Sequence, residues 1–403
     1  MGQYRIFNEA DALVYASDQL DFFPADADLT ATEFGDGNLN LVFKVTDQNS
    51  KQSVILKQAL PYARCVGESW PLSTDRARIE AQVLQIHGEI CPEHTVKILK
   101  FDEPLSLMAM EDLSDHQIWR AALIDGKQHP NTGKHIARYL AKTLFYTSDF
   151  YLDPKVKKAK VAQFINPDLC LITEDLFFTD PYREHERNSF NALIEKDVLA
   201  LREDFALQSK VAALKYKFLN HAEALLHGDV HSGSIFVTAT STKVIDAEFG
   251  YYGPIGFDVG SPIGNLLLNY AGQIGLNDLP TAKAFQAYLC TQISQLWQTF
   301  ETEFTRLLNE ETTDVAFKLD EFQHKMIQQI FIDAIGFAGT ELIRRTIGLA
   351  HVADIMNIED TAVRAKSERL ALALGRALVM QAEQFETIDD VLDCVNLVSK
   401  KFL

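Results

Sequence analysis

Three carboxylates in the second half of the chain stand in short motifs whose residue types are suited to chemistry. Asp229 lies in LLHGDVHSGSIFV, where Gly228 and Gly233 favour a loop. A carboxylate on such a loop can accept or orient the proton of a hydroxyl group. Asp246 and Glu248 follow the apolar residues of KVIDAEF. We expect a strand end there, with both side chains on one face and within reach of a Mg²⁺ ion, which prefers oxygen ligands.

An orienting carboxylate followed by paired carboxylates is the arrangement that phosphoryl transfer uses, with the first at the acceptor hydroxyl and the others at the metal. The alternative for the pair is a strand end that faces solvent. His227 and His231 could suggest zinc, but the loop glycines oppose the helix on which that spacing would bring two rings together. We expect both rings to fix the loop through hydrogen bonds.

The N-terminal part of the chain has two features that suit phosphate binding. Gly35 and Gly37 precede an apolar run, and glycines there let the backbone approach a phosphate, although a plain hairpin turn is the alternative. Lys57 lies in the apolar run SVILKQA, and Glu80 follows in a helical pattern. A strand lysine that holds phosphates needs such an acidic partner. A lysine that points to water from an edge strand is the alternative.

Arg344 and Arg345 stand in an apolar pattern, Phe331 to Ile355, that is typical of a buried helix. Buried guanidinium groups need compensation. The spacing permits a structural salt bridge to Glu341 or Asp354, and it equally permits recognition of an anion.

The elements that must position these residues divide the chain into two parts. The N-terminal part predicts short strands, a hairpin around residues 46–52 and one helix at Arg76 to Ile86. His94 to Leu113 predicts two further strands, broken at residues 102–104. The C-terminal part predicts long helices, interrupted by strands within residues 234–249. The predicted long helices are Lys134 to Phe150, Val198 to Leu226, Pro280 to Leu308 and Phe322 to Ala350.

Composition excludes several classes of protein. The chain has 403 residues, 47% of them hydrophobic and 23% charged, which is ordinary for a globular protein. A net charge of −18 opposes a nucleic-acid binder that neutralises phosphates. Five scattered cysteines predict reduced thiols. The N-terminus lacks a signal-peptide pattern, and no uninterrupted apolar run reaches the length of a membrane span. We therefore expect a cytoplasmic protein with no membrane or nucleic-acid partner.

Several longer stretches carry a family resemblance. The Asp229 and Asp246 motifs resemble the protein-kinase-like superfamily of small-molecule kinases, which includes aminoglycoside, choline and homoserine kinases. Within it the chain resembles the methylthioribose kinases. The stretches that carry this closer resemblance are QALPYARCVGESWPLSTDRARIE, MAMEDLS, HGDVHSGSIFV and VIDAEFGYYGPIGFDVGSPIGNLLLNY.

The resemblance implies a role for each matching residue. It places ATP at the Gly35–Gly37 turn, Asn40, Lys57 and the backbone of an inter-lobe hinge at Glu111, Asp112 and Leu113. It places Asp229 at the sugar hydroxyl and assigns Asp246, Ala247 and Glu248 to ATP and Mg²⁺. Arg344 and Arg345 match twin arginines near the sugar and the transferring phosphate. Trp70 matches a tryptophan loop that covers the sugar.

Ser234 departs from the wider superfamily, in which most members carry an asparagine that gives an oxygen to Mg²⁺. A serine hydroxyl is shorter and a weaker ligand, and Glu248 can supply the missing oxygen. Serine also fits the methylthioribose kinase pattern. We therefore expect Ser234, Asp246 and Glu248 at the metal.

The expected fold is α+β and bilobal, with a β-rich ATP-binding lobe at residues 1–110, a hinge at 111–114 and a helical lobe with the substrate site at 115–403. The expected activity is ATP- and Mg²⁺-dependent phosphorylation of a small thiosugar, and the resemblance implies a homodimer. The alternatives are a related kinase for an amino alcohol or aminoglycoside, and a pseudokinase that binds nucleotide without turnover.

Overall fold

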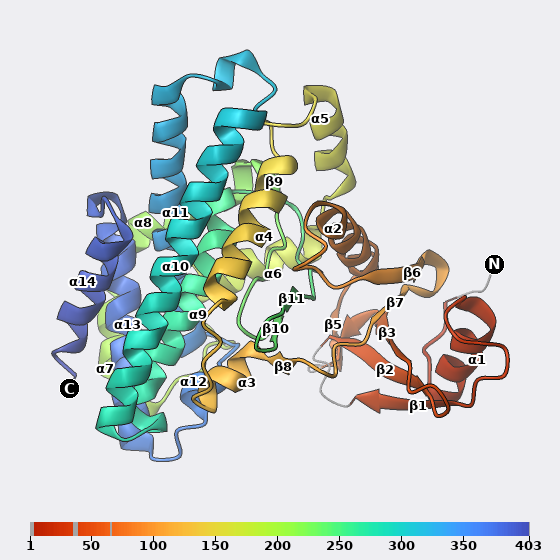
Figure 1. Ribbon diagram of the computed structural model, residues 1–403. Helices are drawn as coiled ribbons and strands as arrows, with labels where there is room; N and C mark the ends of the chain where they lie inside the picture. Colours follow the sequence, from red (N-terminus) through yellow and green to blue (C-terminus); the bar gives the residue numbers. More distant parts are fainter. Residues whose placement is uncertain (1–3, 35–38, 65–66, 403) are drawn as a thin grey trace.

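An antiparallel five-stranded sheet in the order β1-β2-β3-β7-β6 forms the framework of the N-terminal lobe (Figure 1). The computed structural model describes residues 4–34, 39–64 and 67–402. Residues of β2 and β3 alternate between buried and half-buried, because successive side chains of a strand point to opposite faces of the sheet. The sheet strands are β1 (Leu29–Phe34), β2 (Asn40–Asp47), β3 (Ser53–Ala59), β6 (Ile98–Asp102) and β7 (Leu107–Glu111).

Two helices cover the opposite faces of this sheet. Helix α1 (Glu9–Gln19) packs in one apolar cluster with Leu56 of β3, whereas α2 (Arg76–Ile90) packs in another with the neighbouring Ile55. Because side chains alternate along a strand, Lys57 shares the face of Ile55 and lies under α2. The Lys57 side chain therefore points towards α2, the helix that carries Glu80.

The predicted hairpin, the α2 helix and the strands on either side of residues 102–104 are confirmed. Helix α1 and strand β1 were not expected from the sequence. Helix α1 begins with a capping box, in which Asn8 accepts a hydrogen bond from the Asp11 backbone and the Asp11 side chain accepts one from the Asn8 backbone. This N-x-x-D pattern is the local signal that marks the start of the helix.

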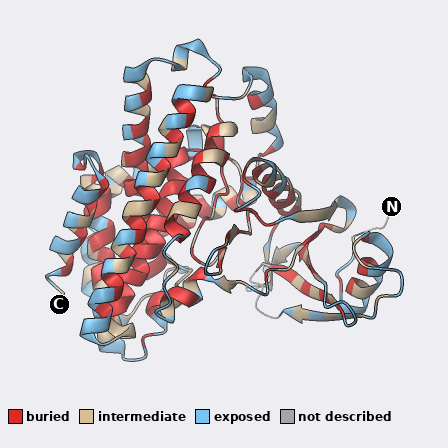
Figure 2. Ribbon diagram, viewed as in Figure 1, coloured by how far each residue is buried: buried red, intermediate tan, exposed pale blue. Residues whose placement is uncertain are grey.

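The C-terminal lobe is built around α9 (Ile255–Leu276) and α11 (Asp320–Ile347), which are almost entirely buried along their contact (Figure 2). The two helices approach closely at Gly260, where a Cβ atom would lie 2.2 Å from the Ala334 carbonyl oxygen. This contact needs glycine, and along the same helix pair Asn265 of α9 reaches Glu341 of α11. The other helices are α3 (Trp119–Ile124), α4 (Thr132–Tyr146), α5 (Pro154–Gln163), α6 (Pro167–Phe178), α7 (Glu195–Arg202), α8 (Phe205–Asn220), α10 (Leu279–Glu311), α12 (Ala353–Met356), α13 (Thr361–Gln381) and α14 (Ile388–Ser399).

Short strands between the helices carry the polar motifs. A three-stranded sheet has the order β11-β10-β8, and β12 pairs with β9. The small pair β4-β5 belongs to the N-terminal lobe. These strands are β4 (Tyr62–Ala63), β5 (Gly67–Pro71), β8 (Gln117–Ile118), β9 (Ala224–Leu225), β10 (Ile235–Val237), β11 (Thr242–Val244) and β12 (Tyr252–Gly253).

The predicted helices have different bounds in the structure. Helix α4 ends at Tyr146 instead of Phe150, and two further predictions differ more. The pattern from Val198 to Leu226 divides into α7 and α8, because Asp204 caps a new helix by accepting a hydrogen bond from the Leu207 backbone at 3.0 Å. Residues 224–225 then form strand β9. The predicted helix that begins at Phe331 ends at Ile347, followed by Gly348, instead of reaching Ile355.

Helix α11 is the one element of the described residues that is long and apolar enough to cross a membrane by length and composition. Its most apolar window is 78% buried inside the fold. A core helix has this property, and α11 packs against both α9 and α13.

A buried histidine joins α2 to the C-terminal lobe and gives a testable pH dependence. His87 Nδ1 lies 2.7 Å from the Tyr139 hydroxyl and Nε2 lies 3.3 Å from the Leu225 carbonyl oxygen. Burial lowers the pKa of His87 to about 3, from an ordinary value of 6.5. The unfolded chain therefore binds a proton below pH 6.5 that the folded chain does not, and stability is lost as the pH falls.

Unfolding of the wild-type protein at acid pH takes up a proton on His87. We expect His87→Gln to take up about one proton fewer. Between roughly pH 6 and pH 4, the wild-type free energy of unfolding should fall more steeply than that of the variant, by about 1.4 kcal/mol per pH unit. Urea unfolding at several pH values measures both slopes. Parallel slopes for the two proteins would contradict a neutral His87 in the fold.

Candidate active site

The loop that carries Asp229 is fixed by its backbone. Gly228 has a φ of 85°, and a Cβ atom there would lie 2.2 Å from the Phe249 carbonyl oxygen. Asp258 of α9 accepts hydrogen bonds from the backbone N–H groups of His227 at 2.7 Å and Gly228 at 3.0 Å. A buried carboxylate and a glycine conformation therefore hold the peptide that precedes Asp229.

Both histidine rings of the loop accept hydrogen bonds from backbone groups, as the sequence predicts. His227 Nδ1 accepts from the Asp229 N–H at 3.2 Å, and its Nε2 lies 2.8 Å from the Ile245 carbonyl oxygen. His231 Nδ1 accepts from the N–H groups of Gly233 at 3.0 Å and Ser234 at 3.1 Å. The His231 proton therefore lies on Nε2, 3.3 Å from Asp229 Oδ2. His231 thus orients the carboxylate of Asp229.

Asp229 faces a cluster of cations. The Nη2 atoms of Arg344 and Arg345 lie 3.8 Å and 3.9 Å from Asp229 Oδ1. Burial alone would raise the pKa of Asp229, but His231 and the two arginines hold it well below its ordinary value. The carboxylate is therefore ionised at neutral pH, and its side chain keeps 21% of its surface exposed. An ionised, accessible carboxylate can orient a hydroxyl group.

The twin arginines combine the two roles that the sequence left open. Glu341 accepts hydrogen bonds from Nε of Arg344 and, at 2.9 Å, from Nε of Arg345. The Arg344 guanidinium also lies over the Phe177 ring, 3.6 Å from its centroid, and its Nη2 is buried without a hydrogen-bond partner among the described residues. Burial lowers the pKa of Arg344 to about 10, which leaves it charged at neutral pH. Each guanidinium uses Nε for a structural salt bridge to Glu341, and its Nη2 faces Asp229.

Lys57 connects the two lobes. Its Nζ lies 2.8 Å from Glu80 Oε1 and also pairs with Asp246 Oδ1. These carboxylates overcome the effect of burial and raise the pKa of Lys57 above its ordinary value. The predicted Lys57–Glu80 pair is confirmed. The lysine stays charged and lies beside the carboxylate that the sequence assigns to the metal.

The expectation that strand alternation places Asp246 and Glu248 on one face is wrong. Strand β11 ends at Val244, and Asp246 has a φ of 73°, which is uncommon for a residue other than glycine and is not a strand conformation. Glu248 turns to the N-terminal lobe, where its Oε2 accepts from Arg76 Nε at 3.1 Å and Asn40 Nδ2 at 3.2 Å. The Asp246 side chain keeps 38% of its surface exposed, whereas Glu248 keeps 5%. A shared Mg²⁺ site for Asp246 and Glu248 stays a prediction.

Arg76 links several segments around Glu248. Its guanidinium is 1% exposed and donates to the carbonyl oxygens of Leu60 at 2.8 Å and Leu39 at 3.0 Å. It also donates to Asn40 Oδ1 at 3.1 Å. Asn40 thus lies in a buried polar network that joins β2, α2 and Glu248, at the end of the turn that the sequence assigns to ATP.

The remaining predicted residues lie around this centre. Ser234 Oγ donates to the Asp229 carbonyl oxygen at 3.2 Å, and Ala247 is fully buried. Trp70 of β5 lies across from Arg187 of the other lobe, with 5.9 Å between guanidinium and ring centroid. Gly35 and Gly37 lie outside the described residues. Ligation by Ser234 and coverage of a sugar by Trp70 stay predictions.

The predicted hinge begins at the last residue of β7. Glu111 ends that strand, and its Oε1 accepts from the Lys97 backbone at 2.7 Å. The Asp112 carboxylate pairs with Lys44 at 2.7 Å, and Leu113 is buried. The chain therefore leaves the five-stranded sheet at residues 111–113, where the backbone of a hinge is expected.

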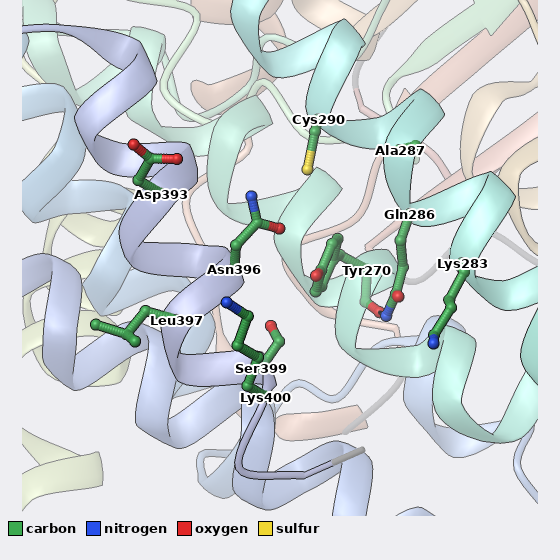
Figure 3. Close-up of a pocket in the computed structure, with 10 residues that line it drawn as sticks. All are labelled: Tyr270, Lys283, Gln286, Ala287, Cys290, Asp393, Asn396, Leu397, Ser399 and Lys400. Atoms are coloured by element: carbon green, nitrogen blue, oxygen red, sulfur yellow. Dashed lines mark hydrogen bonds between the residues drawn. The ribbon is translucent and has the colours of Figure 1, made fainter.

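A cavity of about 810 Å³ lies elsewhere, between α9, α10 and α14 (Figure 3). Tyr270, Gln286 and Asn396 are among its lining residues, together with exposed lysines. None of the residues around Asp229, Lys57 or Asp246 lines it. The candidate active site is therefore the polar cluster between the lobes and not this cavity.

Comparisons with known proteins show the family to which the chain belongs. Residues 30–299 match the model of the phosphotransferase enzyme family. Methylthioribose kinase of Cronobacter sakazakii is 54% identical over 97% of this chain and 98% of its own length. Methylthioribose kinase of Yersinia enterocolitica is 53% identical over 97% of this chain and 98% of its own. This chain belongs to the methylthioribose kinase family.

Among solved structures, an ethanolamine kinase of Plasmodium vivax aligns over 92% of this chain and 91% of its own, with 16% identity and a TM-score of 0.45. The assignment to the methylthioribose kinase family rests on the sequence matches. With it, the bilobal kinase-like fold and the phosphotransferase activity predicted from the motifs are confirmed.

Three positioning residues of this methylthioribose kinase family member were not identified from the sequence. Asp258 and Arg76 act through partners that are distant along the chain, so no local spacing points to them. The available signal was their residue type in an apolar context, because a buried charge must have a partner. Arg120 of α3 was missed for the same reason, and it donates to Ser232 Oγ at 3.1 Å in the loop that carries Asp229.

Proposed function

We propose that this chain transfers the γ-phosphoryl group of ATP to the 1-hydroxyl of S-methyl-5-thioribose, giving ADP and S-methyl-5-thioribose 1-phosphate in methionine salvage. The observation that carries the proposal is the Asp229 carboxylate, ionised and a fifth exposed, with two guanidinium groups just beyond hydrogen-bond distance. The curated relatives named methylthioribose kinase support the choice of substrate.

Each residue of the centre has a defined role in this reaction. Asp229 orients the sugar hydroxyl and takes its proton while the oxygen bonds to the γ-phosphorus and the bond from phosphorus to ADP breaks. Arg344 and Arg345 stabilise the negative charge on the transferring group through donors that are held in place beforehand. Lys57 binds the phosphates of ATP, and the backbone at residues 111–113 meets the adenine edge.

The residues present fit a Mg²⁺ ion. No group of three His, Cys, Asp or Glu side chains in the described part of the chain forms a ready-made metal site. Mg²⁺ does not need one, since it is usually held by one or two carboxylates together with substrate phosphates and water. Asp246, accessible and beside Lys57, would hold it, with Glu248 and Ser234 as further ligands. The ion would neutralise charge on the phosphates.

The charge of the site favours a neutral sugar over the cationic substrates of related kinases. Two buried guanidinium groups beside Asp229 would repel an amino alcohol or an aminoglycoside. The homodimer that the resemblance implies and the cytoplasmic location expected from the sequence stay predictions.

A competition assay tests the substrate class. Purified protein with Mg·ATP should release ADP with S-methyl-5-thioribose and not with choline or kanamycin. The thiosugar rate should be unchanged by a tenfold excess of choline. ADP release with a cationic acceptor and none with the thiosugar would overturn the proposal. If none of the acceptors gives ADP release, the protein binds nucleotide without this activity.

A further inference from the structure

Glu341 is a fully buried carboxylate beside the catalytic Asp229 that has no assigned role. It lies on α11, one turn before the twin arginines, and is 0% exposed. Each of its two oxygens binds one arginine: Oε2 accepts from Arg344 Nε, and Oε1 accepts from Arg345 Nε. One carboxylate thus fixes both guanidinium groups by the same edge.

This arrangement controls how far the arginines stand from Asp229. With each Nε bound to Glu341, the Nη2 atoms stop 3.8 Å and 3.9 Å from Asp229 Oδ1, which is beyond hydrogen-bond distance. Arg344 Nη2 is left as a buried donor without a partner among the described residues, directed towards the space beside Asp229. A donor that is buried and unpaired is costly unless a ligand uses it.

Glu341 is itself anchored to the rest of the centre. Its Oε1 also accepts from Asn265 Nδ2 of α9 at 3.0 Å. Asn265 Oδ1 accepts in turn from Arg120 Nη2 at 2.7 Å, and the backbone N–H of Arg120 donates to the Ser232 carbonyl oxygen at 2.9 Å. A continuous set of hydrogen bonds therefore runs from Glu341 to the catalytic loop.

The Glu341 side chain is ionised at neutral pH. Burial alone would raise its pKa, but Arg344 and Arg345 hold the pKa below its ordinary value. Without that charge, the nearest carboxylate for two buried cations is Asp229. A direct hydrogen bond from a guanidinium would occupy the Asp229 oxygen that must accept the substrate proton.

We propose that Glu341 is a positioning residue that holds Arg344 and Arg345 back from Asp229, so that the catalytic carboxylate stays free and the Nη2 donors stay available to the transferring phosphoryl group. The inference rests on the proposed function, because it assigns those donors to the reaction.

Two substitutions separate charge from shape. Glu341→Gln keeps the size of the side chain and removes its charge, whereas Glu341→Asp keeps the charge and shortens the reach. We expect kcat for methylthioribose to fall on the order of 100-fold in Glu341→Gln, with the KM for ATP within about twofold of wild type. Glu341→Asp should retain at least roughly ten times the kcat of Glu341→Gln.

Asp333→Asn is the matched control. Asp333 lies on the same helix, is 4% exposed and pairs with Lys217 at 2.6 Å, away from Asp229. Its loss should lower the thermal midpoint and leave kcat within about twofold of wild type. If Glu341→Gln matches this control in kcat, or if Glu341→Asp is the slower of the two variants, Glu341 only fills space and the inference is wrong.

A ligand-free crystal structure of Glu341→Gln gives a readout that does not depend on the substrate. At least one guanidinium should move to within hydrogen-bond distance of Asp229, and unchanged positions would overturn the inference. Wild-type protein that does not phosphorylate methylthioribose would instead defeat the proposed function. If Glu341→Gln does not fold, Asn265→Ala should show a smaller loss of kcat with the ATP KM unchanged, and an unchanged kcat would count against the anchoring role.

Discussion

Asp229→Asn should lower kcat for methylthioribose on the order of 10³-fold. The substitution keeps the size of the side chain and removes the charge that orients the acceptor hydroxyl and takes its proton, an effect worth typically 10²–10⁴-fold. An asparagine has one acceptor oxygen in place of two, so its nitrogen would face either the His231 N–H or the two guanidinium groups, and one favourable contact would be lost. Steady-state ADP release at saturating ATP measures kcat.

Asp229→Asn should leave nucleotide binding and folding intact, because Lys57 and the predicted hinge do not contact it. Titration with a fluorescent ATP analogue and thermal unfolding check both properties. A variant that folds and binds nucleotide but keeps more than a tenth of the wild-type kcat would show that another group acts on the hydroxyl.

Asp246→Asn should have the next largest effect, a loss of kcat/KM for ATP of roughly 10²–10³-fold with a raised Mg²⁺ requirement. The variant removes the accessible carboxylate that pairs with Lys57 and is assigned to Mg²⁺. Asparagine tolerates the φ of 73° at this position, so the backbone should not change. Initial rates across a Mg²⁺ series at fixed ATP give the shift.

Two further variants complete the Mg²⁺ measurement. Asp204→Asn breaks an ion pair with Arg376 in the helical lobe and serves as the control, with no expected change in the Mg²⁺ requirement. Glu248→Gln tests the second carboxylate, which now accepts from Arg76 and Asn40. An unchanged Mg²⁺ requirement in Asp246→Asn would remove this residue from the metal site.

The chemistry of the site was predictable from the sequence where it depends on local patterns. The HGD loop, the strand lysine and its partner Glu80 follow from residue type and order along the chain, and the Lys57–Glu80 contact of 2.8 Å confirms the pairing. The two-lobe division follows from the change between strand and helix periodicity. Local spacing carries this information because each element folds from its own segment.

The orientation of the carboxylates was not predictable in the same way. Strand alternation would place Asp246 and Glu248 on one face, but the left-handed conformation at Asp246 directs them to different partners. The partners of Glu248 lie in the other lobe, so only the tertiary fold brings them together. Backbone conformations of this kind occur where the surrounding structure holds them, often at functional sites.

The twin arginines show a different limit of sequence reasoning. Salt bridge and anion recognition are alternatives when a guanidinium is treated as one charge. In the structure each guanidinium uses Nε for Glu341 and directs Nη2 towards Asp229, because its several donors point in different directions. Spacing along a helix identifies possible partners but not which edge each partner occupies.

The central claim is transfer of phosphate to the 1-hydroxyl of S-methyl-5-thioribose, and ³¹P nuclear magnetic resonance of the reaction mixture tests it most directly. Wild-type protein with Mg·ATP and the thiosugar should produce ADP and one phosphomonoester resonance coupled to the anomeric proton, and Asp229→Asn should produce neither at a comparable rate. Release of inorganic phosphate alone, or a phosphomonoester on another hydroxyl, would contradict the account.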